Sequence, residues 1–516
     1  MMRLRLSYWI AGLALLAALA CSSSALPAVD GVVTDAAAEP TNTPIVTPKP
    51  TTVPTPLPLT VYEAAMRPGF ERDIDPYLDG NHYWIDMAIE VEPVRIDGHQ
   101  RVRYVNRSDD TLNEIVFRLV VNAFSYDQLQ SISNVTVNGA SVETSLSVGN
   151  TAATIQLPQS LASGDSVEIE MDFNVDLPES FDASYGRIAD YGDIVTLASF
   201  YPMLSVYERG AWWDSPLLEQ GDPAYSETAL YDLNIITPSS YTMAASGTSL
   251  DSHRNVDSTT NTVIVTGPVR DLALVLMRNP ELETSTQDGV TINIWSREGK
   301  HQDDEFGLNK TQLALRLFDD AFGEYPYNEF DVIEAPISAA GIEFPGLILM
   351  ADAVWDRTDG SLFEFVLAHE IGHQWWYGLV SNDQINEPWL DEALADFSVI
   401  VYFREGYGEE AGQSVRDFFQ EDVDDYIKNY DEDLPTGLPV SAYQGRQYST
   451  FVYNKGALFY SHLEDDYGAG KVSQMLKAYF QRHRYGIVHN TDLRQITGEL
   501  FGDDATQFFD EWVLGG

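Results

Sequence analysis

The segment from Leu367 to Leu394, LAHEIGHQWWYGLVSNDQINEPWLDEAL, constrains the fold of this chain more than any other. It contains the pattern H-E-x-x-H, formed by His369, Glu370 and His373, and a further glutamate, Glu392, after eighteen intervening residues. On a helix, two imidazoles at positions i and i+4 lie one turn apart on the same face, which is the separation that one small cation needs. The pattern therefore predicts a helix that carries a metal site.

The candidate ligands are those of a catalytic zinc site. His369 and His373 supply two nitrogens, and a second helix that carries Glu392 can supply an oxygen, so the fourth position of a tetrahedral zinc ion stays open. Structural zinc sites are closed, whereas catalytic ones keep a position for water or substrate. Glu370 follows the first histidine directly and can bond a water in that position without binding the metal. We therefore expect one Zn²⁺ per chain, with Glu370 as the general base.

The first sixty residues have the features of an export signal and a tether. Two arginines precede an apolar run, Tyr8–Ala20, that is too short for an ordinary membrane-spanning helix and ends in small residues. Cys21, the one cysteine of the chain, follows directly and resembles the cysteine that is lipidated in bacterial lipoproteins. We predict a signal peptide over residues 1–20. A lipidated Cys21 then begins a Pro- and Thr-rich linker over residues 21–60.

These features predict a protein outside the cytoplasm, either anchored to the cell membrane through Cys21 or secreted. Its folded part has no cysteine and cannot rely on disulfides, so metal binding and core packing must stabilise it. The formal net charge of −49 makes nucleic acids and anionic membrane surfaces improbable partners. We expect peptide substrates and a monomer.

The length of 516 residues and the apolar content of 44% predict a globular chain with more than one domain. Across residues 61–275, short runs rich in β-branched and aromatic residues alternate with turn sequences. This spacing predicts an N-terminal domain that is an antiparallel β-sandwich or saddle without a catalytic motif. Across residues 276–516, strand patterns give way to helical ones, which include Leu362–Tyr377 and Thr450–Tyr467. The chain is therefore expected to be a multidomain α+β protein.

Three segments of the second half resemble, in the right order, the aminopeptidase N-type zinc metallopeptidases, which are gluzincins. Trp389–Ala395, WLDEALA, resembles the W-L-N-E-G-F-A segment that carries the third zinc ligand of that family. Ala340–Ile348, AGIEFPGLI, resembles its G-x-M-E-N exopeptidase motif, and Tyr453–Ala457, YNKGA, resembles its Y-x-K-G-A segment. The resemblance implies a thermolysin-like catalytic domain, with a mixed sheet and a helical half, over residues 276–516.

The resemblance also implies roles for individual residues. Glu343 would bind the free α-amine of the substrate from an edge strand, with Gly341 beside it in the same motif. Tyr453 would donate a hydrogen bond to the oxyanion of the tetrahedral intermediate, a role that suits a phenol because it stays neutral near pH 7. Tyr448 matches another active-site tyrosine of some members.

The chain departs from the family pattern in two places. Members usually supply a second amine ligand, Gln or Glu, from the β-rich domain, and the comparable stretch here, Ser199–Met203, offers Tyr201 instead. The large C-terminal helical cap domain of longer members has no counterpart, so we expect a short, lipoprotein-like bacterial member.

The sequence therefore predicts a zinc-dependent aminopeptidase. Three alternatives stay open at this stage. They are an endopeptidase or broad peptidase, an epoxide hydrolase on the same zinc site, and a non-enzymatic surface lipoprotein that keeps the fold for binding.

Overall fold

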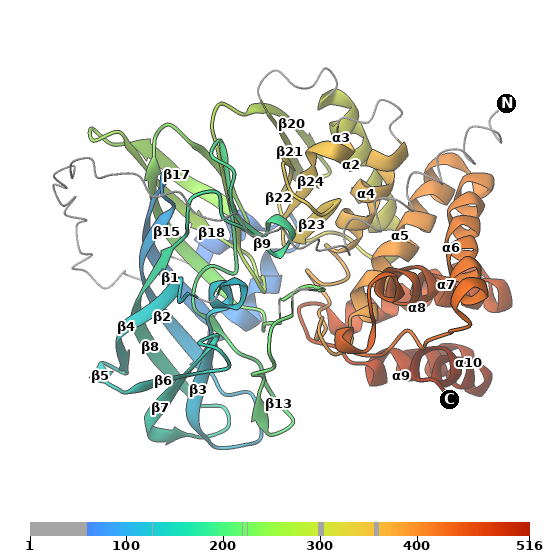
Figure 1. Cartoon of the computed structure of the whole chain (residues 1–516), viewed down its shortest axis with the longest axis horizontal. Coiled ribbons are helices and arrows are strands. Elements are labelled where there is room, and N and C mark those ends of the chain that lie inside the picture. Colours follow the sequence, from blue (N-terminus) through green and yellow to red (C-terminus); the bar gives the residue numbers. More distant parts are fainter. Residues whose placement is uncertain (1–58, 126, 219, 224, 298–303, 356–360) are drawn as a thin grey trace, which may run out of the picture.

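The computed structural model describes residues 59–125, 127–218, 220–223, 225–297, 304–355 and 361–516 (Figure 1). The predicted signal peptide, Cys21 and almost all of the predicted linker lie outside this part of the chain. Within it, no helix is both long enough and apolar enough to cross a membrane. Figure 1 shows a β-rich N-terminal half beside a C-terminal half that ends in helices.

The largest sheet of the N-terminal half has eight strands, and alternating burial explains why they form. In β8 (Ser166–Asp176) every second residue from Val167 to Val175 is buried, which is the pattern of a strand with one face in a core. The spatial order of the sheet is β17 (Thr248–Arg254), β18 (Thr259–Val265), β15 (Leu230–Pro238), β1 (His82–Glu90), β2 (Arg95–Val105), β8, β4 (Gln130–Val137) and β5 (Ala140–Ser141).

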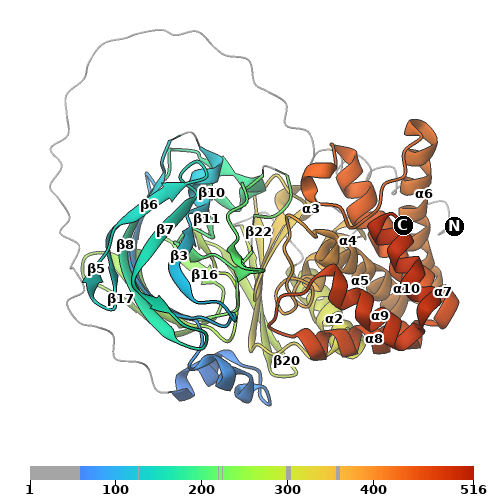
Figure 2. The ribbon, with the colours of Figure 1, turned by 90° about the horizontal axis from the view of Figure 1, so that it is seen from below.

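Smaller sheets complete the N-terminal half, and Figure 2 shows the sheets curving around a shared interior. One follows the order β16 (Thr242–Ala245), β19 (Ala273–Met277), β11 (Ile194–Ala198), β10 (Ile188–Asp190) and β9 (Asp182–Ala183). Another follows the order β12 (Met203–Leu204), β3 (Leu112–Arg118), β7 (Ala152–Leu161) and β6 (Thr144–Ser147). A hairpin of β13 (Tyr207–Glu208) and β14 (Ala211–Trp212) lies apart from them.

One pair of strands in this half departs from the predicted antiparallel pairing. β1 and β15 pair in parallel, with His82 opposite Leu230 and Ala88 opposite Ile236. Parallel neighbours need a long connection, and here about 140 residues, which include strands of the smaller sheets, separate the two strands.

A five-stranded mixed sheet begins the C-terminal half and lies between the β-rich half and the helices in both views (Figures 1 and 2). Its order is β20 (Glu281–Gln287), β21 (Val290–Ser296), β22 (Glu329–Ala335), β24 (Leu347–Ala351) and β23 (Gly341–Phe344). β23 pairs only with β24 among the described strands, so it is the edge strand that the resemblance implied for Glu343.

The helices of the C-terminal half pack on one side of this sheet (Figures 1 and 2). They are α2 (Asp304–Phe322), α3 (Asp352–Trp355), α4 (Ser361–Gly372), α5 (Trp389–Tyr407), α6 (Glu409–Tyr430), α7 (Lys455–Tyr467), α8 (Ala469–His483), α9 (Asn490–Phe501) and α10 (Asp503–Phe509). α4 and α5 are the most apolar and lie at the centre, where α5 is buried from Trp389 to Tyr402. A helix that is apolar on all sides belongs in a core.

Two helix predictions need correction. The helix expected over Leu362–Tyr377 ends at Gly372, because the next turns tighten onto the Gly372 carbonyl and the chain reverses at Tyr377, whose φ is +116°. The helix expected over Thr450–Tyr467 begins as a π-helical segment, Tyr448–Asn454, before α7.

Candidate active site

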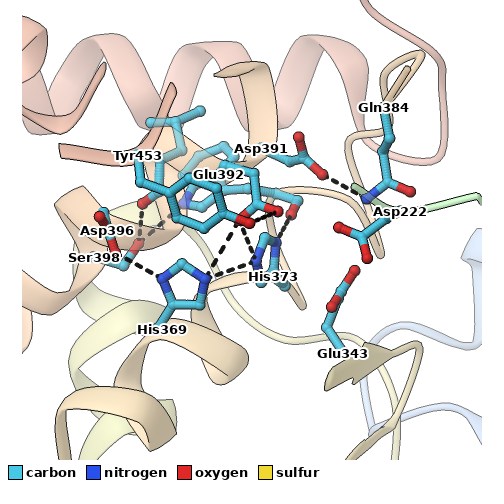
Figure 3. A network of polar contacts seen from close by, with 12 residues as sticks. Asp222, Glu343, His369, His373, Gln384, Asp391, Glu392, Asp396, Ser398 and Tyr453 are labelled. Atoms are coloured by element: carbon cyan, nitrogen blue, oxygen red, sulfur yellow. Dashed lines mark hydrogen bonds and ion pairs between the residues drawn. The ribbon is translucent and has the colours of Figure 1, made fainter. Parts of the chain in front are cut away.

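Close packing of α4 on α5 brings the three predicted metal ligands together. A Cβ at Gly372 would lie only 3.0 Å from the Cβ of Ser398, so this glycine permits the approach of the two helices. The Nε2 atoms of His369 and His373 lie 3.2 Å apart, and Oε2 of Glu392 lies 3.4 Å and 3.3 Å from them (Figure 3). The predicted triad is therefore one cluster.

Hydrogen bonds at the other ring nitrogens fix how the two imidazoles point. Nδ1 of His369 lies 2.8 Å from Oδ1 of Asp396, and Nδ1 of His373 lies 3.0 Å from the carbonyl oxygen of Trp376. Such contacts leave both Nε2 atoms free for a metal and orient the rings. Asp396 was not among the residues predicted from the sequence, although its position four residues after Glu392 places it on the same helix face.

The donor set and its charge fit a zinc ion. Oε2 of Glu392 is buried and has no hydrogen bond of good geometry, so its lone pair is available to bind a metal ion. Burial alone would lower the pKa of His373, but the carboxylates of Glu343 and Glu392 outweigh it and raise that pKa to about 10. The cluster thus attracts positive charge, and two imidazoles with one carboxylate are a ligand set that catalytic zinc takes.

A cavity of about 260 Å³ opens onto the cluster. All but one of the residues predicted to act in catalysis, metal binding or substrate binding line it, namely Gly341, Glu343, His369, Glu370, His373, Glu392, Tyr448 and Tyr453. The cavity also contains apolar side chains from α4 and α6, Leu362, Phe365, Val366 and Phe418.

Glu370 lies beside the ligands, in contact with strand β23. A Cβ at Gly341 would come within 2.4 Å of Oε1 of Glu370, so only glycine leaves room for this carboxyl group. Burial raises the pKa of Glu370 to about 7.

Tyr453 approaches the cluster from the π-helical segment. Its hydroxyl donates to Oε1 of Glu392 at 2.6 Å, and its ring stacks on that of His369 with centroids 5.8 Å apart. Tyr448 is buried beside it, with ring centroids 5.6 Å apart. Both tyrosines therefore belong to the wall of the cavity.

Glu343 is held by a residue that the sequence analysis missed. Nη2 of Arg187 lies 3.2 Å from each carboxylate oxygen of Glu343, and the same nitrogen forms an ion pair with Asp222. Arg187 and Glu343 are 5% and 4% exposed, so this contact is almost completely shielded from water. No local motif marks Arg187 or Asp222 in the sequence.

The structure does not place Tyr201 in the cavity. Tyr201 is fully buried in the core of the N-terminal half, and its hydroxyl donates to that of Tyr231 at 3.0 Å. The expectation that it contacts substrate is therefore wrong, and the acidic side chain that the β-rich half brings to this end of the cavity is Asp222.

Comparison with known proteins agrees with this site. Residues 306–512 match the model of the peptidase family M1 domain, and this range contains the metal cluster, Glu370 and Tyr453. This part of the chain is therefore an M1 peptidase domain. The M1 domain begins at α2 and extends almost to the end of the chain.

Curated relatives that match this chain include aminopeptidase M1-B of Oryza sativa subsp. japonica and aminopeptidase N of Lactococcus lactis subsp. lactis. The first is 23% identical over 262 residues, which are 47% of this chain and 29% of the relative. The second is 24% identical over 246 residues, which are 44% of this chain and 28% of the relative. The matched region thus spans less than a third of the length of these relatives.

The matches to solved structures extend over much more of this chain. The M1 zinc metallopeptidase from Deinococcus radiodurans is 20% identical with a TM-score of 0.65, over 84% of this chain and 94% of that one. At this identity the likeness shows the fold. The prediction of a β-rich N-terminal domain followed by a catalytic domain with a mixed sheet and a helical half is confirmed.

Proposed function

We propose that this protein is a zinc-dependent aminopeptidase with one Zn²⁺ held by His369, His373 and Glu392. The observation that carries the proposal is the convergence of these three ligands with Glu370, Tyr453 and Glu343 in one cavity. The curated relatives are aminopeptidases, and a mutant of the Deinococcus radiodurans protein is described as bound to a Tyr-Ser-Ala substrate.

When bound, zinc would lower the pKa of the attacking water and polarise the scissile carbonyl. The side chains of this protein then have separate tasks. Glu370 takes a proton from the water and delivers it to the leaving amine, which is general base and then general acid catalysis. The Tyr453 hydroxyl, which donates to Glu392 at 2.6 Å, turns to donate to the oxyanion that forms next to the ligands.

In this proposal, Glu343 determines whether the enzyme requires a substrate with a free amino end. Its buried carboxylate on the edge strand β23 is a counter-ion for an ammonium group, so it favours substrates with a free amino end. An endopeptidase cleaves within a peptide chain, where no free amine is present to pair with this carboxylate. A requirement for a free amine therefore distinguishes an aminopeptidase from an endopeptidase.

The test compares aminoacyl nitroanilides with the same compounds carrying an N-acetyl group, with purified zinc-loaded protein. We expect hydrolysis of the free amines and a rate at least about a hundredfold lower for the blocked substrates, because they lack the charge that Glu343 would bind. A chelator should abolish both activities, and zinc should restore them. Equal rates on free and blocked substrates would instead indicate an endopeptidase or broad peptidase.

We also propose that the protein is exported and anchored to the membrane through a lipid on Cys21. The support is the apolar run that ends in small residues immediately before this one cysteine. Expressed in a bacterium, the wild-type chain should sediment with membranes, and the Cys21→Ser variant should not. Equal distribution of the two proteins would refute lipid anchoring. We propose a monomer, which size measurement of the detergent-solubilised protein checks.

A further inference from the structure

The cavity extends from the metal cluster along one face of α4. Leu362, Val366 and His369 lie on this face at intervals of four and three residues, so the wall that they form is about 10 Å long. Glu343 lies beyond the other side of the metal ligands, within 4.8 Å of His373, the ligand farthest from Leu362 (Figure 3). A peptide whose amino end lies at Glu343 therefore extends its leaving residues along this wall.

Two phenylalanines continue the wall from α4 to α6. Phe365 precedes His369 by one helical turn, and the centroid of its ring lies 6.4 Å from that of Phe418 on α6. Asp422 follows Phe418 by one turn, and both of these residues line the cavity. An apolar wall therefore leads from a metal ligand to the carboxylate of Asp422.

Asp422 holds Arg446 at this end of the cavity. The Asp422 side chain is 11% exposed, and its Oδ1 forms an ion pair with Nη2 of Arg446. Its Oδ2 accepts hydrogen bonds from Oγ1 of Thr450 at 2.8 Å and from Nδ2 of Asn454 at 2.9 Å. Thr450 and Asn454 belong to the π-helical segment that also carries Tyr453. The position of Arg446 is therefore fixed relative to that of the active-site tyrosine.

Arg446 has donors available for a ligand. Among the described residues that line the cavity, two have a guanidinium or ammonium group, Arg187 and Arg446. Arg187 is 5% exposed and is paired with Glu343 and Asp222. The Arg446 side chain is 42% exposed, and its guanidinium bonds one carboxylate in the described part of the chain. Because a guanidinium has five N–H donors in a planar fork, a second carboxylate fits on its remaining edge.

The size of the cavity limits the length of substrate that it encloses. Its volume of about 260 Å³ lies just below the roughly 300–1,000 Å³ of most small-molecule sites, so it encloses only a short peptide. Such a peptide ends beside Arg446, and its end is a carboxylate. A longer chain would pass Arg446 with an uncharged peptide group.

We propose that Arg446 binds the C-terminal carboxylate of a peptide of two or three residues, and that Asp422 is a positioning residue that holds the guanidinium in place. The proposal deepens the aminopeptidase function and rests on it. The substrate class is then short peptides with two free ends, which have an ammonium group at one end of the cavity and a carboxylate at the other.

The test compares kcat/KM of the zinc-loaded protein for Leu-Phe and Leu-Gly-Phe with kcat/KM for the same peptides that end in an amide. The wild type should prefer the acid at one or both lengths by about 10- to 100-fold, because only the acid accepts a charge-assisted hydrogen bond from Arg446. When Leu-Gly-Phe is extended by three alanines, the acid and the amide should differ by less than about threefold, since that carboxylate lies beyond Arg446.

Variants assign this preference to the ion pair. Arg446→Gln should reduce the preference for the acid to less than about threefold, chiefly through a higher KM for the acid. Arg446→Lys should restore part of the preference because the positive charge returns, although the planar fork does not. Asp422→Asn should give an intermediate preference, because the guanidinium remains but is no longer held by a carboxylate. Zinc content should be equal in all variants.

The chain offers a matched control outside the cavity. The Arg482 side chain is 44% exposed and is likewise paired with one carboxylate, that of Glu499. Arg482→Gln should therefore keep the preference of the wild type for the acid.

Two results would overturn the proposal and leave the aminopeptidase function standing. Equal losses on acid and amide in Arg446→Gln would indicate a general structural role. A wild-type protein that releases leucine equally fast from the acid and the amide at both short lengths would show that the carboxylate is not recognised. If the wild type releases leucine from none of these peptides, the aminopeptidase function itself fails together with the proposal, which is a distinct result.

Discussion

At the residue scale, the site depends on how the ligands are oriented by their neighbours. Asp396 contacts Nδ1 of His369 at 2.8 Å and is 3% exposed. It therefore fixes the ring of a ligand without touching the metal position. Mutation of a residue that orients a metal ligand in this way typically weakens metal binding by about 10- to 100-fold.

We predict that Asp396→Asn raises the zinc dissociation constant by about 10- to 100-fold, because the amide cannot stabilise the ring as the carboxylate does. Competition with a chromophoric chelator measures this constant. Glu405→Gln changes an exposed acid of the same helix and should leave the constant unchanged. Wild-type affinity in the Asp396 variant would show that the Nδ1 contact has no role in zinc binding.

At the element scale, glycines set the distance between the central helices. A Cβ at Gly456 would lie 2.4 Å from the Cβ of Ala393, so this residue lets the start of α7 reach α5 next to Glu392. The same approach brings Tyr453, three residues earlier, to its hydrogen bond with Glu392. Helix packing and site geometry therefore depend on the same small residue.

We predict that Gly456→Ala destabilises the protein by about 1–3 kcal/mol through overpacking and also lowers turnover. Denaturant unfolding and steady-state kinetics measure the two effects. Gly470→Ala is the matched control, because a Cβ there meets nothing within 4 Å, so it should be neutral or stabilise α8 by up to about 1 kcal/mol. Unchanged stability in the Gly456 variant would mean that the helices can move apart freely.

At the scale of the whole molecule, the two halves are joined by buried and half-buried charges. His489 at the start of α9 contacts Glu208 of β13 through Nε2 at 2.9 Å and Glu387 before α5 through Nδ1 at 2.6 Å. The hydrogen bonds that the ring donates to Glu208 and Glu387 raise the pKa of His489 to about 10. The protonated imidazole thus links the β-rich half to the helical half.

This link should depend on pH. A histidine whose pKa rises on folding stabilises the folded state fully below its unfolded pKa of about 6.5, and the contribution is lost as pH rises towards 10. We predict that the melting temperature of the wild type falls between pH 6 and pH 9 by several °C more than that of His489→Gln. His253→Gln, at an exposed position of β17, should follow the wild type. If the melting temperatures of all three proteins changed with pH in the same way, His489 would not stabilise the contact between the two halves.

The site could be predicted best where its residues lie close together in the sequence. His369, Glu370 and His373 lie within one helical turn and Glu392 on the next helix, so spacing alone predicts their cluster. Arg187 and Glu343 are 156 residues apart, and their contact depends on how two halves dock, which no periodicity encodes. Tyr201 was misplaced for the same reason, because strand patterns predict that a segment is buried but not which cavity it reaches.

The most direct test of the central claim, that Glu370 works as the base beside a zinc ion held by three other residues, is Glu370→Gln. Its zinc content and its turnover of an aminoacyl nitroanilide are measured on the same preparation. We predict stoichiometric zinc, as in the wild type, with turnover reduced by at least about 100-fold, because the amide cannot accept the proton. Turnover equal to that of the wild type in a zinc-loaded Glu370→Gln variant would contradict this account.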